Sequence, residues 1–138
     1  MGLFDKTELT ETERQINLMT NNRLNGCSYC MAAHTAVSKM AGVDEDVIAA
    51  LRSGKTLADT KLEALRTFSV IVHETRGHPT EAQVDALLVA GYTKQTVLEV
   101  IVGTSLKVLS NYTTPIVKPE VDAGFAALAW SAEEATAA

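Results

Sequence analysis

The chain has 138 residues, of which 46% are hydrophobic, 21% charged and 5% aromatic. This length predicts one domain, residues 1–138, that buries a hydrophobic core without cross-links. The formal net charge of -5, with no cluster of Lys or Arg, argues against nucleic acid as a partner. No apolar segment is long enough to span a membrane, and the first residues lack a secretory-signal pattern. We therefore expect a cytoplasmic protein without a membrane partner.

The apolar residues recur with the period of an α-helix, and no segment of useful length alternates as a strand does. Capping boxes mark two helix starts, at Thr10 with Glu13 and at Thr80 with Gln83. After an arm of residues 1–9, the expected helices are Thr10–Met19, Cys27–Met40, Glu45–Leu51, Asp59–Glu74, Thr80–Gly91, Thr93–Ser110 and Asp122–Trp130, followed by a frayed tail. The pattern predicts an all-α fold, a compact bundle of about six to seven helices.

The segment Thr93–Ser110 is apolar on most sides. Its polar or small residues Glu99, Gly103 and Lys107 recur at steps of four, which places them on one stripe of the helix. A helix that is apolar on most sides lies at the centre of a fold or in a subunit interface. We expect the stripe of Glu99, Gly103 and Lys107 to face solvent or another subunit.

The only two cysteines, Cys27 and Cys30, are three residues apart at the expected start of a helix. In the cytoplasm such a pair is more often catalytic or metal-binding than a structural cross-link. Unpaired N–H groups and the helix dipole stabilise a thiolate at this position. A thiolate attacks peroxides and disulfides, and a second thiol nearby resolves the oxidised product as a disulfide.

His34 follows Cys30 by four residues, so the two side chains share one face of the helix. A histidine there accepts the thiol proton or, when protonated, stabilises the thiolate. The spacing favours Cys30 as the thiol activated by His34 and Cys27 as its resolving partner. The opposite assignment stays open, because the helix dipole favours the cysteine nearest the helix start.

Other interpretations of these residues compete with redox chemistry. The cysteines could be buried and inert, and His34 could be a core histidine bonded to a backbone carbonyl. A zinc site would need Cys27, Cys30, His34 and a fourth ligand, His73 or His78, from another helix. We expect neither a metal nor a cofactor, and we assign His73 and His78 structural roles.

The segment from Asn25 to His34 resembles the signature of the alkyl hydroperoxidase D-like, carboxymuconolactone decarboxylase superfamily. Further segments resemble the family as well: Ala41-Gly42-Val43, Gly91-Tyr92 and Asn111-Tyr112. The resemblance implies an all-helical fold and a homo-oligomer such as a trimer or hexamer. It also implies peroxidase or thiol–disulfide activity, with Cys27, Cys30 and His34 as the matching residues. The substrate would be a hydroperoxide or a disulfide, and an unidentified thiol would be the reductant.

Two positions depart from the pattern of the peroxidases in this superfamily. They carry a glutamate twelve residues before the first cysteine, as part of a proton relay, and Gln15 stands there in this chain. A glutamine orients a histidine or a water but is not a base. Glu11, one helical turn earlier, is the candidate substitute. Some members also carry a histidine just before the second cysteine, where this chain has Tyr29, a poor base near neutral pH.

Three functions are therefore considered. The first is a thiol-dependent peroxidase or thiol–disulfide oxidoreductase that reduces hydroperoxides in antioxidant defence. The second is a decarboxylase or related lactone-processing enzyme, which the other branch of the superfamily implies and which does not need the cysteines. The third is a non-enzymatic redox sensor whose dithiol state alters a partner surface. Of the three, the Cys-x-x-Cys pair followed by His34 favours the oxidoreductase.

Overall fold

The computed structural model describes residues 2–137, and within them every regular element is a helix. The all-α prediction is confirmed. The elements are η1 (Phe4–Lys6), α1 (Glu11–Leu24), α2 (Ser28–Met40), α3 (Glu45–Ser53), α4 (Thr60–Thr75), α5 (Glu81–Val89), α6 (Lys94–Val117), η2 (Ala123–Leu128) and α7 (Ala132–Ala137), where η marks a 3₁₀-helix.

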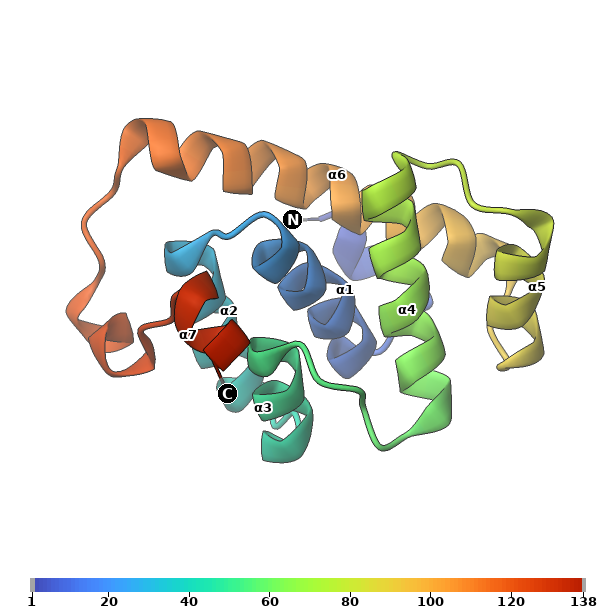
Figure 1. The fold of residues 1–138 in the computed structure, drawn as a ribbon, viewed down its shortest axis with the longest axis horizontal. Helices are drawn as coiled ribbons and strands as arrows, with labels where there is room; N and C mark the ends of the chain where they lie inside the picture. The colour runs from blue at the N-terminus through green and yellow to red at the C-terminus, as the bar shows by residue number, and fades with distance from the viewer. Residues whose placement is uncertain (1, 138) are drawn as a thin grey trace.

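Helix α1 lies at the centre of the molecule and contacts α2, α3, α4 and α6 (Figure 1). Its buried apolar residues, such as Ile16 and Met19, join Leu65, Phe68 and Val100 in one hydrophobic cluster. The long helix α6 runs along one side of the bundle, and α5 lies at its outer end (Figure 1). This arrangement places the start of α2 beside both α1 and α6.

The capping boxes predicted at Thr10 and Thr80 are both formed. The hydroxyl of Thr10 accepts the N–H of Glu13 at 3.2 Å, and the Glu13 carboxylate accepts the Thr10 N–H at 2.8 Å. The Thr80 hydroxyl accepts the N–H of Gln83 in the same way. These local bonds satisfy N–H groups that a helix leaves unpaired at its start, so the sequence located both starts within one residue.

The prediction that the first helix ends near Met19 is wrong, because α1 continues to Leu24. Asparagines favour turns when their amides bond to the nearby backbone. Here Asn21 and Asn22 are fully buried. Their amides donate to α6 and to the start of α2, and the Asn21 amide also donates to the Asn17 carbonyl within α1. Contacts with other helices therefore favour continuation of α1, in addition to one local bond.

Helix α6 is also longer than expected, since it passes Ser110 and ends at Val117 with Pro115 inside its last turn. A proline removes one backbone donor. The missing donor falls so near the helix end that only one bond is lost before Lys118 ends the helix with a positive φ of 49°.

The C-terminal segment differs from the expected helix Asp122–Trp130. It forms the 3₁₀-helix η2, and the tail expected to be frayed forms α7. The guanidinium of Arg52 donates to the carbonyls of Leu128 and Ala129 at 3.1 and 2.8 Å. The Trp130 ring N–H donates back to the Arg52 carbonyl at 2.8 Å. These bonds fasten the segment to α3.

The stripe of Glu99, Gly103 and Lys107 is buried against the rest of the fold, which corrects the expectation that it faces solvent or another subunit. The exposed side of α6 is the apolar one, with Leu98, Leu109 and Ile116 64%, 70% and 82% exposed. A Cβ at Gly103 would lie 1.9 Å from Asn17 Oδ1. Glycine at this position therefore lets α6 approach α1 closely.

Within residues 2–137, no single helix combines the length and apolar character needed to cross a membrane. Helices α5 and α6 meet that test only as a pair, and the pair is bent by 109°.

Candidate thiol site

The two cysteines form a disulfide at the start of α2. Cys27 is the N-cap residue, and its Sγ accepts the N–H of Cys30 at 3.4 Å. Both side chains are buried, at 3% and 5% exposed. The pair therefore occupies the position where helix N–H groups and the dipole favour a negative sulfur.

Three asparagine amides connect this helix start to α1 and α6. Asn25 donates to Asn111 Oδ1 at 2.9 Å, and Asn111 donates to Asn22 Oδ1 at 2.9 Å. Asn22 then donates to the Cys30 carbonyl at 3.1 Å. The backbone N–H of Cys27 donates to the Asn22 carbonyl. These bonds fix the position of the cysteine pair relative to both neighbouring helices.

His34 lies between α1 and α6, with both ring nitrogens engaged and only 9% of the residue exposed. Its Nδ1 is 2.9 Å from Gln15 Oε1, and its Nε2 is 3.0 Å from Lys107 Nζ. An ammonium can only donate, so Nε2 accepts and the ring proton lies on Nδ1, directed at Gln15. His34 thus bonds to two side chains and not to the backbone carbonyl that the structural interpretation required.

Burial governs the charge of both groups. Desolvation, with a further contribution from the charge of Lys107, lowers the pKa of His34 to about 3. Desolvation also lowers the pKa of Lys107 to about 8. Near neutral pH, His34 is therefore a neutral imidazole, while Lys107 is protonated in most molecules.

Glu11, the candidate substitute for the relay glutamate, is separated from His34 by Gln15. Gln15 donates from Nε2 to Glu11 Oε1 at 2.8 Å. The pKa of Glu11 is lowered, chiefly by the hydrogen bond from Gln15. Burial raises this pKa by a smaller amount, and the hydrogen bond and charge of Arg14 lower it further. Glu11 is therefore connected to His34 only through an amide.

A cavity of about 360 Å³ opens beside the disulfide. Its lining comes from α1, α2 and α6: Leu18, Tyr29, Cys30, Ala33, His34, Leu106, Lys107, Leu109, Ser110 and Thr114. We call it the cysteine cavity. Cys30 lines it and Cys27 does not, and Cys30 Sγ lies 3.6 Å from the Thr114 hydroxyl. A molecule in the cysteine cavity would therefore meet Cys30 first.

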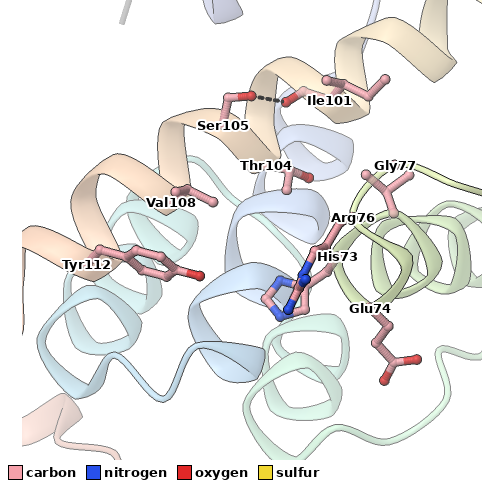
Figure 2. A pocket seen from close by; sticks show the side chains of 10 residues that line it. His73, Glu74, Arg76, Gly77, Ile101, Thr104, Ser105, Val108 and Tyr112 are labelled. Atoms are coloured by element: carbon pink, nitrogen blue, oxygen red, sulfur yellow. Dashed lines mark hydrogen bonds between the residues drawn. The ribbon is translucent and has the colours of Figure 1, made fainter.

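A larger cavity lies elsewhere, between the end of α4 and the side of α6 (Figure 2). It measures about 610 Å³, and its lining includes His73, Arg76 and Tyr112. His73 Nδ1 is 3.3 Å from Asn21 Oδ1. No sulfur lines this space, which we call the His73 cavity. Its size alone does not give it the chemistry of the smaller one.

The structure brings Cys27, Cys30, His34, Gln15 and Tyr29 to one region. His73 and His78 lie apart from it, and His78 bonds to the end of its own helix. Among the side chains that the structure describes, no group of three or more His, Cys, Asp or Glu could hold a metal ion. Sequence reasoning missed the contact of Lys107 with His34. The available signal was a lysine in the interior of a mostly apolar helix.

The family model of the carboxymuconolactone decarboxylase family matches residues 1–70. A solved structure titled as an uncharacterized peroxidase-related protein from Silicibacter sp. TM1040 superposes with a TM-score of 0.77 at 17% identity. The match covers 87% of this chain but only 64% of that one. No curated protein sequence matches significantly. The structural likeness therefore concerns the fold.

Proposed function

Because the chain belongs to the carboxymuconolactone decarboxylase family, we propose a thiol-dependent oxidoreductase that reduces hydroperoxides with Cys30 and Cys27. One observation carries the proposal most directly. The two cysteines are bonded to each other at a helix start, and Cys30 lines a cavity beside the buried His34 and Lys107. A dithiol that closes into a disulfide next to a cavity is what such a reaction requires.

The reaction divides into three balanced steps. The Cys30 thiol attacks the hydroperoxide O–O bond, forms a sulfenic acid and releases an alcohol. The Cys27 thiol then attacks that sulfur, so a disulfide forms and water leaves. An external dithiol of unidentified nature reduces the disulfide by thiol–disulfide exchange and leaves as its own disulfide.

Activation of Cys30 rests mainly on the helix start, where N–H groups stabilise a thiolate. Lys107, at the other end of the same cavity, adds a positive charge. His34 is neutral and bonded to Lys107, so its role in this proposal is to hold the ammonium at the cysteine cavity. Gln15 fixes the ring of His34 from the other side.

A stopped-flow experiment tests the proposal. Reduced protein is mixed with cumene hydroperoxide, and loss of thiolate absorbance is followed at several pH values. We expect oxidation much faster than that of a free thiol at the same pH, and a Cys27→Ser variant should accumulate a sulfenic acid that dimedone traps. Oxidation no faster than that of a free thiol would reject the proposal.

The family is named for a decarboxylase, which makes such an enzyme the second candidate. The two candidates differ in their need for sulfur. A double variant with Cys27→Ser and Cys30→Ser that still turned over a lactone substrate would favour the decarboxylase. We expect the double variant to be inactive toward hydroperoxides.

Our proposal includes assembly into a homo-oligomer, such as a trimer or hexamer, through the exposed apolar side of α6. Leu98, Leu109 and Ile116 on that side are all more than half exposed. Several large apolar side chains exposed on one helix are typical of an interaction site. Light scattering of the wild type and of Ile116→Ser tests the assembly, and a monomeric wild type would contradict it.

A further inference from the structure

Lys107 is a buried cation without a counter-ion. The residue is 4% exposed and stands on the inner side of α6. The ion pairs found in residues 2–137 join Arg14 to Glu11, Lys39 to Glu45 and Arg66 to Glu63, so none of them involves Lys107. A buried charge that is not paired costs several kcal/mol, which makes an uncompensated ammonium an unusual feature.

The hydrogen bonds of Lys107 are also incomplete. An ammonium has three N–H groups to donate. Within the described residues, Nζ has one partner, the neutral ring nitrogen of His34. No aspartate or glutamate lines the cysteine cavity, whose titratable lining residues are Tyr29, Cys30, His34 and Lys107. Donors and charge are therefore available for a ligand that enters from the cavity.

The remaining wall of the cysteine cavity is largely hydrocarbon. Leu18, Ala33, Leu106 and Leu109 line it together with the polar groups. The volume of about 360 Å³ is near the lower end of the range for small-molecule sites, about 300 to 1,000 Å³. Along α6 the cavity extends from Lys107 to Thr114, which is about 10 Å of helix axis.

The ends of this space differ in chemistry. Lys107 lies at one end, while Thr114, close to Cys30 Sγ, lies at the other. A ligand that matches this cavity has an anionic head for Lys107, an aliphatic chain for the apolar wall and, several bonds from the head, a reactive group for Cys30. A planar carboxylate can accept more than one N–H from an ammonium and neutralises its charge.

We propose that the cysteine cavity binds aliphatic carboxylates of medium chain length, with the carboxylate paired to Lys107 and the chain against Leu106 and Leu109. Carboxylate-bearing hydroperoxides are then the preferred substrates, with the O–O bond near Cys30. This last step rests on the proposed peroxidase function, while carboxylate binding does not.

Binding is tested on the oxidised protein, so that no reaction takes place. Isothermal titration calorimetry compares octanoate with octan-1-ol, which has the same chain length without the charge. We expect octanoate to bind at least about tenfold more tightly to the wild type. Lys107→Arg should keep this preference and Lys107→Met should lose it. Lys39→Met removes the same charge from an exposed site and should bind like the wild type.

Equal binding of octanoate and octan-1-ol to the wild type would overturn the proposal, as would a preference that survives in Lys107→Met. Nuclear magnetic resonance of the wild type gives a readout that does not depend on the folding of a variant. Octanoate should shift the methyl signals of Leu106 and Leu109. Shifts confined to other parts of the chain would also overturn it.

Kinetics separates this inference from the proposed function. Reduced protein is assayed with 8-hydroperoxyoctanoate and with its methyl ester. We expect kcat/KM at least about tenfold higher for the acid in the wild type and a ratio near one in Lys107→Met. Octanoate binding without reduction of either compound would reject the peroxidase and leave the carboxylate site standing. Reduction of both at equal rates without octanoate binding would reject the site alone.

Discussion

Two cavities beside α6 contain similar groups in different surroundings. In the cysteine cavity, His34 is bonded to Gln15 of α1 and to Lys107. In the His73 cavity, His73 is bonded to Asn21 of α1, and Arg76 contributes the cation (Figure 2). The difference is burial, because Lys107 is enclosed while Arg76 is exposed. Charge acts strongly only where water is excluded, so the smaller cavity is the better site for chemistry.

The largest expected effect comes from removing the sulfur that lines the cysteine cavity. Cys30→Ser should lower peroxide reduction to the uncatalysed rate, because serine is not oxidised by hydroperoxides. Steady-state assays with an added dithiol measure this. Cys27→Ser is the matched variant and should still consume one equivalent of peroxide in a single turnover. Residual catalytic turnover in Cys30→Ser would place the chemistry elsewhere, with the His73 cavity as the next place to look.

The two histidines give the second test. His34→Ala releases Lys107 and should raise the thiol pKa of Cys30. A rise of one unit would lower the reactive thiolate, and the oxidation rate at pH 7, about tenfold. His73→Ala should leave the rate near that of the wild type. Thiolate absorbance as a function of pH measures the thiol pKa in both variants. Similar losses of oxidation rate in the two variants would show that the two cavities do not differ in this respect.

Gly103 lies on the buried side of α6, where this helix passes close to α1. Gly103→Ala adds a Cβ where Asn17 Oδ1 would be 1.9 Å away, although alanine is the better helix former. Since Asn17 is buried and bonded to Ser69, we expect a loss of about 2 kcal/mol in the free energy of unfolding. Urea denaturation measures it. Gly124→Ala, where a Cβ meets nothing within 4 Å, is the control and should be nearly neutral.

Acid stability gives the smallest effect. The pKa of His34 is about 3 in the folded protein, below the ordinary value of 6.5. Between these values the unfolded chain binds one more proton, so His34 makes stability fall as the pH drops below 6.5. This contribution reaches about 1 kcal/mol at pH 5.5 and should vanish in His34→Gln.

His73 is the comparison residue for the same measurement. Its pKa is also lowered by burial, but Glu74 acts in the opposite direction. We expect His73→Gln to remove a smaller part of the acid dependence than His34→Gln does. Urea denaturation at pH 7 and pH 5.5 compares the variants. An equal or larger effect of His73→Gln would show that His34 is not the more strongly desolvated ring.

The sequence was most informative where structure depends on neighbours in the chain. The pair of Thr10 and Glu13 located the start of α1, and the spacing of Cys30 and His34 placed both side chains at one cavity. Sequence was least informative where distant residues decide the outcome. Asn21 and Asn22 lie within α1, and their amides have partners on α6 and at the start of α2 as well as one within α1. No local pattern contains the partners on the other helices.

The orientation of α6 shows the same limit. An apolar surface normally faces the core, yet here the polar stripe of Glu99, Gly103 and Lys107 faces inward. Glu99 accepts the N–H of Glu8, and Lys107 reaches His34, so long-range bonds hold the polar side inside. Periodicity identified the stripe but gave no means of choosing the side that is buried.

Gln15 has a consequence for where protons travel. In the chain from Lys107 through His34 and Gln15 to Glu11, every group except Gln15 can gain and lose a proton. The amide of Gln15 neither accepts nor releases a proton at ordinary pH, so it interrupts proton transfer along this hydrogen-bonded chain. A proton from a reacting Cys30 thiol therefore cannot reach Glu11 by this route. In the proposed reaction it leaves on the alcohol product.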